Sequence, residues 1–316
     1  MQLLQQIVIV KVYNGLIQNV SGFTVTGLVN NEDKSVLTGI TGDNASGKDV
    51  GVYNTALAGT DTNYNLTFNQ GSLEITKADA TITANSDSKV YNGLIQNVSG
   101  FTVTGLVNNE DKSVLTGITG DNASGKDVGV YNTALAGTDT NYNLTFEDGK
   151  LTITKADLTA TLNDNSKTYD GTSYSGGNGI TFNGFVNGET ASVLGGTLVY
   201  SGTSQGAKDA GNYIISGSGL TSNNYNISFV DGKLTINKKD LTISNITANN
   251  KTYDGTTTAT LGNIGTLVGL VAGEDLVLNN PTSVIFSSKD VGDNIDVTAS
   301  GYTIADKDSF KASNYN

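Results

Sequence analysis

The sequence predicts an all-β fold, arranged as a tandem array of small antiparallel β-sandwich repeats. Three observations lead to this prediction. Residues 11–68 are identical to residues 89–146 over 58 positions, so the chain contains a duplicated unit. Apolar and polar residues alternate over short stretches bounded by Gly, Asn and Asp, a pattern typical of strands and turns. The chain has 316 residues and 39 glycines but one proline, and by size it should form several domains.

Four copies of the unit are present. A Y-[ND]-G signature recurs at Tyr13, Tyr91, Tyr169 and Tyr253, in steps of 78, 78 and 84 residues. Three further landmarks keep their order in every copy: a G-x-V-x-x-E segment ending at 32, 110, 189 and 274, a K-D-x-G segment starting at 48, 126, 208 and 289, and N-Y-N starting at 63, 141, 224 and 314. The expected domains are repeat 1 (11–79), repeat 2 (80–157), repeat 3 (158–240) and repeat 4 (241–316).

Each copy contains six or seven short alternating segments, which suits a small Ig-like sandwich. Residues 142–146 and 151–154 alternate in this way around an Asp-Gly pair, and the pattern predicts a β-hairpin at that pair. The segment NNEDKSVL (30–37) predicts a single helical turn; a longer helix there would favour the alternative, a β-grasp-like unit with one short helix. Strands of about 7 residues with end loops give units of roughly 30 Å, so four in series predict a rod on the order of 100 Å.

The two ends differ from the repeat pattern. Residues 1–10 match no other copy, and their counterpart in repeat 2 is DATITANSDS (79–88). When that segment is read one base out of frame, synonymous codon choices yield MQLLQQIVIV, the observed residues 1–10. We therefore expect residues 1–10 to be an out-of-frame start rather than native structure. Repeat 4 stops at N-Y-N, before the segment that closes each earlier copy, so we expect it to be C-terminally truncated, with an open strand edge.

The composition excludes several classes of function. The chain has no Cys, His, Trp or Arg, so it offers no thiol nucleophile, imidazole base or Cys/His zinc site. Its net charge of −12 and pI near 4.3 oppose binding to nucleic acid and to anionic lipid. No apolar run reaches 18 residues, so no membrane insertion is expected. We expect no enzyme activity, with no catalytic, cofactor-binding or metal-ligating residues.

One motif resembles a phosphate-binding loop. GDNASGKD (42–49) differs from G-x-x-x-x-G-K-[ST] only at its last residue, Asp49. The glycine frame is lost in the other copies, which read GTSQGAKD (202–209) and FSSKD (286–290). The residues that follow are rich in β-formers and glycine, whereas a phosphate loop leads into a helix. The sequence therefore favours a turn.

Two further patterns have alternative interpretations. The recurrent acids Glu32, Glu110, Glu189 and Glu274 resemble half of a glycosidase pair, but no second acid recurs, since Asp33, Asp111 and Asp275 are replaced by Thr190 in repeat 3. Solvated loop carboxylates are the favoured interpretation. Turns such as GTDTNYN (59–65) offer oxygen ligands for Ca²⁺, although no known calcium-loop pattern occurs, and Asx-turns are favoured. The recurrent tyrosines are expected to pack in the core or at its rim with bonded hydroxyls.

The motifs of the last two copies resemble those of a known family. SKTYDG (166–171), GFVNGETASVL (184–194) and DGKLTINK (231–238) resemble the MBG-type repeat, and KTYDGTTTATL (251–261) with GLVAGEDL (269–276) resembles the related YDG-type repeat. Repeats 1 and 2 depart from the pattern, with VYNG for TYDG. Such repeats occur in large bacterial surface or secreted proteins, including filamentous-haemagglutinin-like adhesins. The resemblance implies export, a β-rich domain and a role in adhesion or stalk building.

These observations lead to one functional expectation with one alternative. The chain is expected to be a structural stalk of an exported bacterial adhesin, located at the cell surface or outside the cell. Its partners would then be other domains of the same long chain. The alternative is a weak multivalent binding module for a host or matrix glycan, a matrix protein or sister chains.

Overall fold

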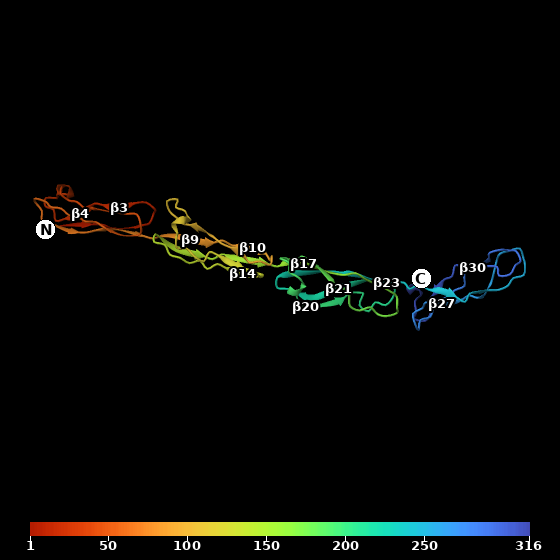
Figure 1. Ribbon diagram of the computed structural model, residues 1–316. Coiled ribbons are helices and arrows are strands. Elements are labelled where there is room, and N and C mark those ends of the chain that lie inside the picture. Colours follow the sequence, from red (N-terminus) through yellow and green to blue (C-terminus); the bar gives the residue numbers. More distant parts are fainter. The chain divides into compact units, whose positions relative to one another are not determined.

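The computed structural model describes residues 1–316 and divides the chain into two compact units, residues 1–155 and residues 156–316 (Figure 1). Each unit holds two of the four repeats. The predicted all-β fold is confirmed, because the only helical elements are single 3₁₀ turns of three residues. The β-grasp-like alternative would need a true helix, and none forms. No helix of the chain is long and apolar enough to span a membrane.

The first unit contains two repeats with the same order of elements. Repeat 1 comprises β1 (Gln2–Gln6), β2 (Val8–Val12), β3 (Gln18–Ser21), β4 (Phe23–Thr26), η1 (Lys34–Val36), β5 (Asn44–Gly47), β6 (Gly51–Asn54), β7 (Leu66–Asn69) and β8 (Ser72–Thr76). Repeat 2 comprises β9 (Ala78–Ala84), β10 (Asp87–Val90), β11 (Gln96–Val98), β12 (Phe101–Thr104), η2 (Lys112–Val114), β13 (Ala123–Gly125), β14 (Gly129–Asn132), β15 (Tyr142–Glu147) and β16 (Lys150–Thr154).

The second unit contains repeats 3 and 4. Repeat 3 comprises β17 (Ala156–Leu162), β18 (Asn165–Thr168), β19 (Ile180–Asn183), η3 (Ala191–Val193), β20 (Gly195–Ser201), β21 (Gly211–Thr221), β22 (Tyr225–Val230) and β23 (Gly232–Asn237). Repeat 4 comprises β24 (Thr242–Ser244), β25 (Thr247–Ala248), β26 (Leu261–Asn263), β27 (Thr266–Val268), β28 (Val277–Leu278), β29 (Ser283–Phe286), β30 (Val297–Ser300), β31 (Ile304–Ala305) and η4 (Ala312–Asn314). The expected boundaries at 79/80 and 157/158 fall inside β9 and β17.

Each of the first three repeats is built from two main sheets. In repeat 2 the strand orders are β12-β9-β15 and β10-β16-β14, and repeat 1 has the same arrangement in β4-β1-β7 and β2-β8-β6. The sheets are mixed rather than purely antiparallel. The first strand runs antiparallel to its neighbour β12 but parallel to β15, with Leu144 opposite Ala80. The same parallel pairing recurs in repeat 3 between β17 and β22.

The predicted hairpin at the Asp-Gly pair is wrong. β15 and β16 do not pair with each other; β15 lies in one sheet and β16 in the other. Gly149 lies at the switch between the sheets, and its φ is not positive as an Asp-Gly hairpin turn would require. A Cβ on Gly149 would lie 2.2 Å from the Asn85 carbonyl oxygen and 2.7 Å from that of Ala84. The glycine is therefore required by the close approach of a neighbouring backbone.

The predicted single helical turn in NNEDKSVL is confirmed. η1 and η2 begin after Asp33 and Asp111, whose carboxylates accept hydrogen bonds from the backbone N–H of Ser35 and Ser113 at 2.8 Å. These N-caps satisfy a backbone donor that the turn leaves free. In repeat 3 the cap is Thr190. The acid that varies between copies is thus an N-cap in the first three.

Alternation along the first strand of each repeat supplies the core. In β17 every second side chain is buried, including Leu158 at 0% exposure and Leu162 at 1%. The side chains of β9 follow the same pattern around Ile82, which is 0% exposed. Fully burying such a side chain stabilises the fold by about 1.5–3 kcal/mol. One core cluster runs from Leu73 and Ile75 of repeat 1 to Ile82 and Tyr142 of repeat 2.

Residues 1–10 are part of the fold, in contrast to the expectation that they lie outside it. β1 occupies the place of β9, pairing with β4 and β7, and Leu4 takes the buried position of Ile82. The reason is that Q-L-L-Q-Q keeps an apolar residue at the central buried position. Gln6 takes the position of Ala84 and is 3% exposed, with its Oε1 lacking any hydrogen-bond partner. The out-of-frame origin concerns the coding DNA and stays a hypothesis.

We expect Gln6→Ala to stabilise the chain by about 1 kcal/mol, because an unpaired buried polar atom costs about 1–3 kcal/mol and one hydrogen bond, from Nε2 to the Asp43 carbonyl, is lost. The measurement is urea denaturation followed by circular dichroism. Gln18→Ala is the control. Gln18 is also buried, but its Nε2 donates to the Val12 carbonyl at 2.9 Å, so its loss should destabilise. Destabilisation by both changes would contradict the expectation.

Candidate functional site: the joints between repeats

Contacts between adjacent repeats bring the four sequence landmarks together. We define the first joint as the contacts between repeats 1 and 2, and the second joint as those between repeats 3 and 4. Each joint lies within one compact unit. The first repeat of each pair contributes its Y-[ND]-G and K-D-x-G segments, and the next repeat contributes its G-x-V-x-x-E and N-Y-N segments.

A carboxylate bridges two tyrosines at the centre of the first joint. Tyr13 of repeat 1 donates a hydrogen bond from its hydroxyl to Glu110 Oε1 at 2.8 Å, and Tyr142 of repeat 2 donates to Glu110 Oε2 at 2.5 Å. The Tyr142 hydroxyl also accepts a hydrogen bond from the Val107 N–H at 3.1 Å. The two rings meet edge to face, with centroids 5.4 Å apart. Both tyrosines are buried, at 4% and 2% exposure.

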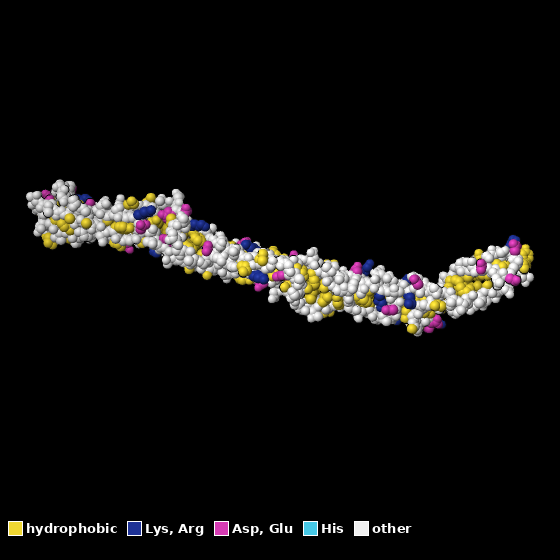
Figure 2. Space-filling model, viewed as in Figure 1, with side chains coloured by type: hydrophobic (Ala, Val, Ile, Leu, Met, Phe, Trp, Pro, Cys, Tyr) yellow, Lys and Arg dark blue, Asp and Glu magenta, His cyan; other side chains and the backbone are white.

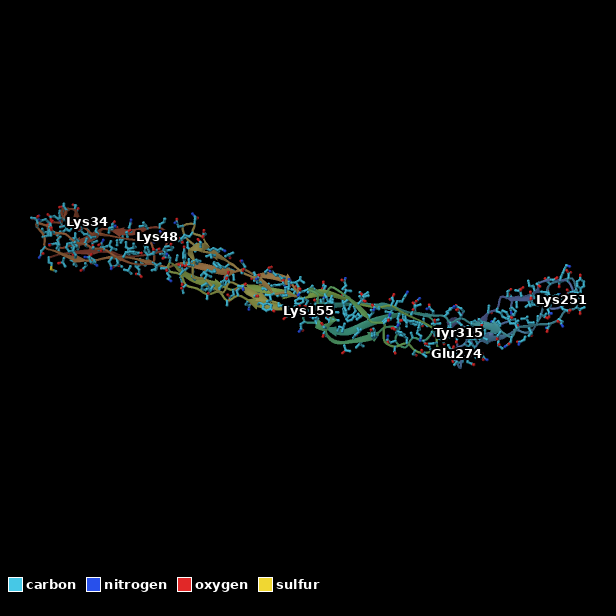
Figure 3. The ribbon with its side chains drawn as sticks, viewed as in Figure 1. Lys34, Lys48, Lys155, Lys251, Glu274 and Tyr315 are labelled. Carbon is cyan, nitrogen blue, oxygen red and sulfur yellow. The ribbon has the colours of Figure 1, made fainter.

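The second joint repeats this arrangement with a different local sequence. Tyr169 and Tyr315 each donate to Glu274 at 2.6 Å, and their rings meet edge to face at a centroid separation of 5.4 Å. Figure 3 labels Glu274 and Tyr315, which lie side by side in the second unit. The backbone N–H of Val271 donates to the Tyr315 hydroxyl at 3.0 Å. The bridge is therefore a property of the repeat type.

An asparagine amide forms a second link across each joint. In the first joint Asn141 donates from Nδ2 to Asp49 Oδ1 at 3.0 Å and accepts from the Val50 N–H at 2.9 Å. In the second joint Asn314 makes the same pair of contacts, with Asp209 at 3.0 Å and the Ala210 N–H at 2.7 Å. The aspartate and the next residue of K-D-x-G thus receive the first asparagine of N-Y-N.

The glycine of Y-[ND]-G is needed for the joint to close. Gly15 has a φ of +72°, which favours glycine. A Cβ at this position would lie 2.7 Å from the Asn108 Cβ of the next repeat. Gly171 has the same φ, and its Cβ would lie 2.9 Å from Val271 Cγ1. The signature therefore supplies both a tight turn and room for the neighbouring repeat.

The positions of the sequence candidates differ from the functions considered for them. Glu110 and Glu274 are tyrosine acceptors in the joints, and Glu189 accepts a hydrogen bond from Tyr225 at 2.6 Å. Glu32 accepts one from Tyr64 within repeat 1. The expectation of solvated loop carboxylates is thus corrected at the joints. The expected bonded hydroxyls of the tyrosines are found there.

The GDNASGKD segment forms a strand and a turn. Residues Asn44–Gly47 are strand β5, and residues 48–50 form the bend whose Asp49 contacts Asn141; Figure 3 labels Lys48 there. β6 follows it, so no helix N-terminus faces the segment. The Asp-rich turns are Asx-turns, as favoured: Asp61 accepts from the N–H groups of Asn63 and Tyr64 at 2.8 and 3.1 Å. The structure holds no group of three or more acidic side chains arranged to bind a metal.

Burial and the neighbouring carboxylate make the joint tyrosines weak acids. Burial, followed by the hydrogen bond to Glu110, raises the pKa of Tyr142 from 10.0 to about 12. Burial and the Glu274 carboxylate likewise raise the pKa of Tyr315 to about 12. The same causes raise the pKa of Tyr13 and Tyr169 further. A phenolate cannot donate to a carboxylate, so ionisation opposes the closed joint.

We expect the stability of the chain to fall as the pH rises from about 10 to 12. In this window the unfolded tyrosines lose protons that the folded ones keep, so the free energy of unfolding decreases with pH. The stabilisation is complete below pH 10, the ordinary pKa of tyrosine. Urea midpoints measured between pH 9 and 12 test this, with Tyr142→Phe as the variant. The variant should flatten the alkaline decline, and an unchanged slope would count against the bridge.

Comparisons with known proteins agree with the repeat assignment. The family model for the MBG domain (YGX type) matches residues 10–74, 80–152 and 158–235, and that for the YDG domain matches residues 237–316. The chain belongs to these families, with three MBG domains and one YDG domain. The predicted family resemblance is thereby confirmed. The joints therefore connect MBG domain 1 to MBG domain 2, and MBG domain 3 to the YDG domain.

Solved structures show only distant likeness to this MBG/YDG array. One is the Bacteroides ovatus mixed-linkage glucan utilization locus protein SGBP-B in complex with a mixed-linkage heptasaccharide, with 14% identity and a TM-score of 0.17, covering 78% of this chain and 70% of that one. Another is the I9–I11 tandem of titin, with 10% identity and a TM-score of 0.17, covering 74% of this chain and 96% of that one. No curated protein matches the chain.

Proposed function

We propose that the MBG and YDG domains are structural spacers of an exported bacterial adhesin, which hold a binding region away from the cell surface and carry out no catalysis. One observation carries the proposal. The residues of all four recurring landmarks meet at the joints, where Tyr13, Glu110 and Asn141 connect neighbouring domains. A repeat whose common residues fix its neighbour is suited to adding length.

Membership in the MBG and YDG families supports an extracellular or surface location for this array. The short connection Lys77 between β8 and β9, with no Gly-rich or Pro-rich linker, also suits a spacer. The partners proposed are other domains of the same long chain. The acidic net charge of −12 supports solubility and opposes binding to nucleic acid.

Reach against domain number tests the proposal. Bacteria or beads would display a peptide epitope on arrays of one to four copies of this chain, beneath a polymer brush of fixed thickness, and antibody binding to the epitope would be measured. A spacer predicts that binding rises once the array exceeds the brush. Binding that is independent of array length would contradict the proposal.

A second candidate, a weak multivalent binding module, is favoured by one observation. Leu16 and Ile17 are 54% and 72% exposed, and their identical counterparts Leu94 and Ile95 are 54% and 74% exposed. Repeats 3 and 4 carry polar residues after the same glycine. Beads coated with the chain, without an epitope, would be tested on purified matrix proteins and glycan arrays. Avidity that rises with copy number and is lost on replacing Leu16, Ile17 and their counterparts by Thr would favour binding over spacing.

A further inference from the structure

A cleft lies in the YDG domain between two segments that face each other. Residues 248–256 form one wall and residues 286–297 form most of the other, and the enclosed volume is about 520 Å³. Figure 3 labels Lys251 on the first wall. Asn249, Lys251 and Tyr253 line it on one side, and Val291 and Val297 line it on the other.

In the three MBG domains a strand fills the equivalent place. It is the central strand of a sheet whose order is β2-β8-β6, β10-β16-β14 or β18-β23-β21. In domain 3, Ile236 of this strand lies opposite Lys167 in a parallel pairing and opposite Gly211 in an antiparallel one. The K-T-Y and K-D-x-G motifs align these two neighbours with residues 251–253 and 289–292 of the YDG domain. The two walls of the cleft are therefore the two neighbours of a central strand, with no strand between them.

Side chains that are covered in domain 3 are exposed at the cleft. Tyr253 is 59% exposed, whereas its counterpart Tyr169 is 3% exposed, and Val291 is 85% exposed. Ile246 is 41% exposed near the position where Leu162 is 1% exposed. Residues 250–253 also form no backbone hydrogen bond to another strand. Figure 2 shows hydrophobic side chains (yellow) on the visible surface of this end of the second unit.

We propose that this cleft binds an extended polypeptide segment of the Gly232–Asn237 type, which inserts as the central strand. Adding a strand to an exposed edge supplies main-chain hydrogen bonds for affinity and side-chain pockets for specificity. The segment runs parallel to residues 249–252 and antiparallel to residues 292–297, in the manner of β23. The MBG domains already use this interface within the chain, so the cleft and its occupant have matching chemistry.

The contacts of β23 define what the cleft selects. Leu234 and Ile236 are 0% and 2% exposed, so the segment needs large apolar side chains two positions apart. It also needs a glycine ahead of them, because a Cβ on Gly232 would lie 2.5 Å from the Leu162 carbonyl oxygen. The specific occupant therefore has the pattern G-x-L-T-I.

The test titrates the full 316-residue chain with a labelled peptide of residues 227–238, ISFVDGKLTINK. Fluorescence anisotropy should show saturable binding of one peptide per chain, and hydrogen exchange should slow at residues 249–254 and 292–297. The Gly232→Val and Leu234→Asp peptides are matched controls that leave the protein unchanged. Each should bind at least about tenfold more weakly, as expected when a buried apolar contact or a close backbone approach is lost.

Two results would overturn the proposal. One is equal binding of all three peptides, or protection confined to segments away from the cleft. The other is a chain that sediments as a dimer without peptide and shows the same protection at 249–254, because a second copy would then occupy the cleft. Saturable binding to a monomeric chain with the stated order of affinities would support it.

Discussion

Glu110→Ala should destabilise the chain by about 2–4 kcal/mol, whereas the same change at Glu32 should cost no more than about 1 kcal/mol. Glu110 accepts hydrogen bonds from Tyr13 and Tyr142, and its loss leaves two buried hydroxyls without their acceptor. Glu32 lies in an identical local sequence but is exposed and bonds only to Tyr64. The pair of variants thus isolates the contribution of the joint. Urea denaturation of the full chain measures the difference.

The same pair of variants should differ in the rigidity of the first joint. The chain has no cysteine, so Val52→Cys and Val130→Cys, at positions 61% and 59% exposed on either side of the joint, accept spin labels cleanly. The distribution of distances between the labels should broaden in Glu110→Ala and stay narrow in Glu32→Ala. Equal stability and equal distributions for the two variants would show that the bridge does not hold the domains together.

The identity of the copies explains why the joints could not be predicted from the sequence. Tyr13 and Glu110 are 97 residues apart, and an identical acid, Glu32, lies much nearer in the chain. Pattern alone cannot decide whether a landmark tyrosine meets the acid of its own repeat or of the next one. Local features were predictable because their partners are close in sequence, as with the caps Asp33 and Asp111 and the Asx-turn at Asp61.

The path of the chain between sheets was also beyond the sequence pattern. Alternation over residues 142–146 and 151–154 correctly predicts two strands, and the Asp-Gly pair between them favours a hairpin by the usual turn rules. The structure instead pairs each strand with the first segment of the repeat, through the ladders β15–β9 and β16–β10. These contacts span more than 60 residues. Local turn chemistry therefore gave way to long-range pairing.

Gly149→Ala should destabilise the chain by about 3 kcal/mol or more, the second large effect that we expect. The new Cβ would lie 2.2 Å from the Asn85 carbonyl oxygen and 2.7 Å from that of Ala84. Both are backbone atoms of the paired segment, so neither can move without disturbing the ladders on each side of the switch. Gly149 also accepts and donates hydrogen bonds with Thr133, which fix its position.

Gly129→Ala in the same domain is the control for this prediction. Its Cβ would meet only the Tyr131 ring, at 3.7 Å, which is ordinary van der Waals contact. Its φ is not positive, so the substitution should be neutral or stabilise by up to about 1 kcal/mol through the unfolded chain. Urea denaturation of both variants gives the comparison. If Gly149 served as a hairpin glycine, replacement by Asn, which tolerates positive φ, would restore stability. Because the constraint is space for a Cβ, Gly149→Asn should be as damaging as Gly149→Ala.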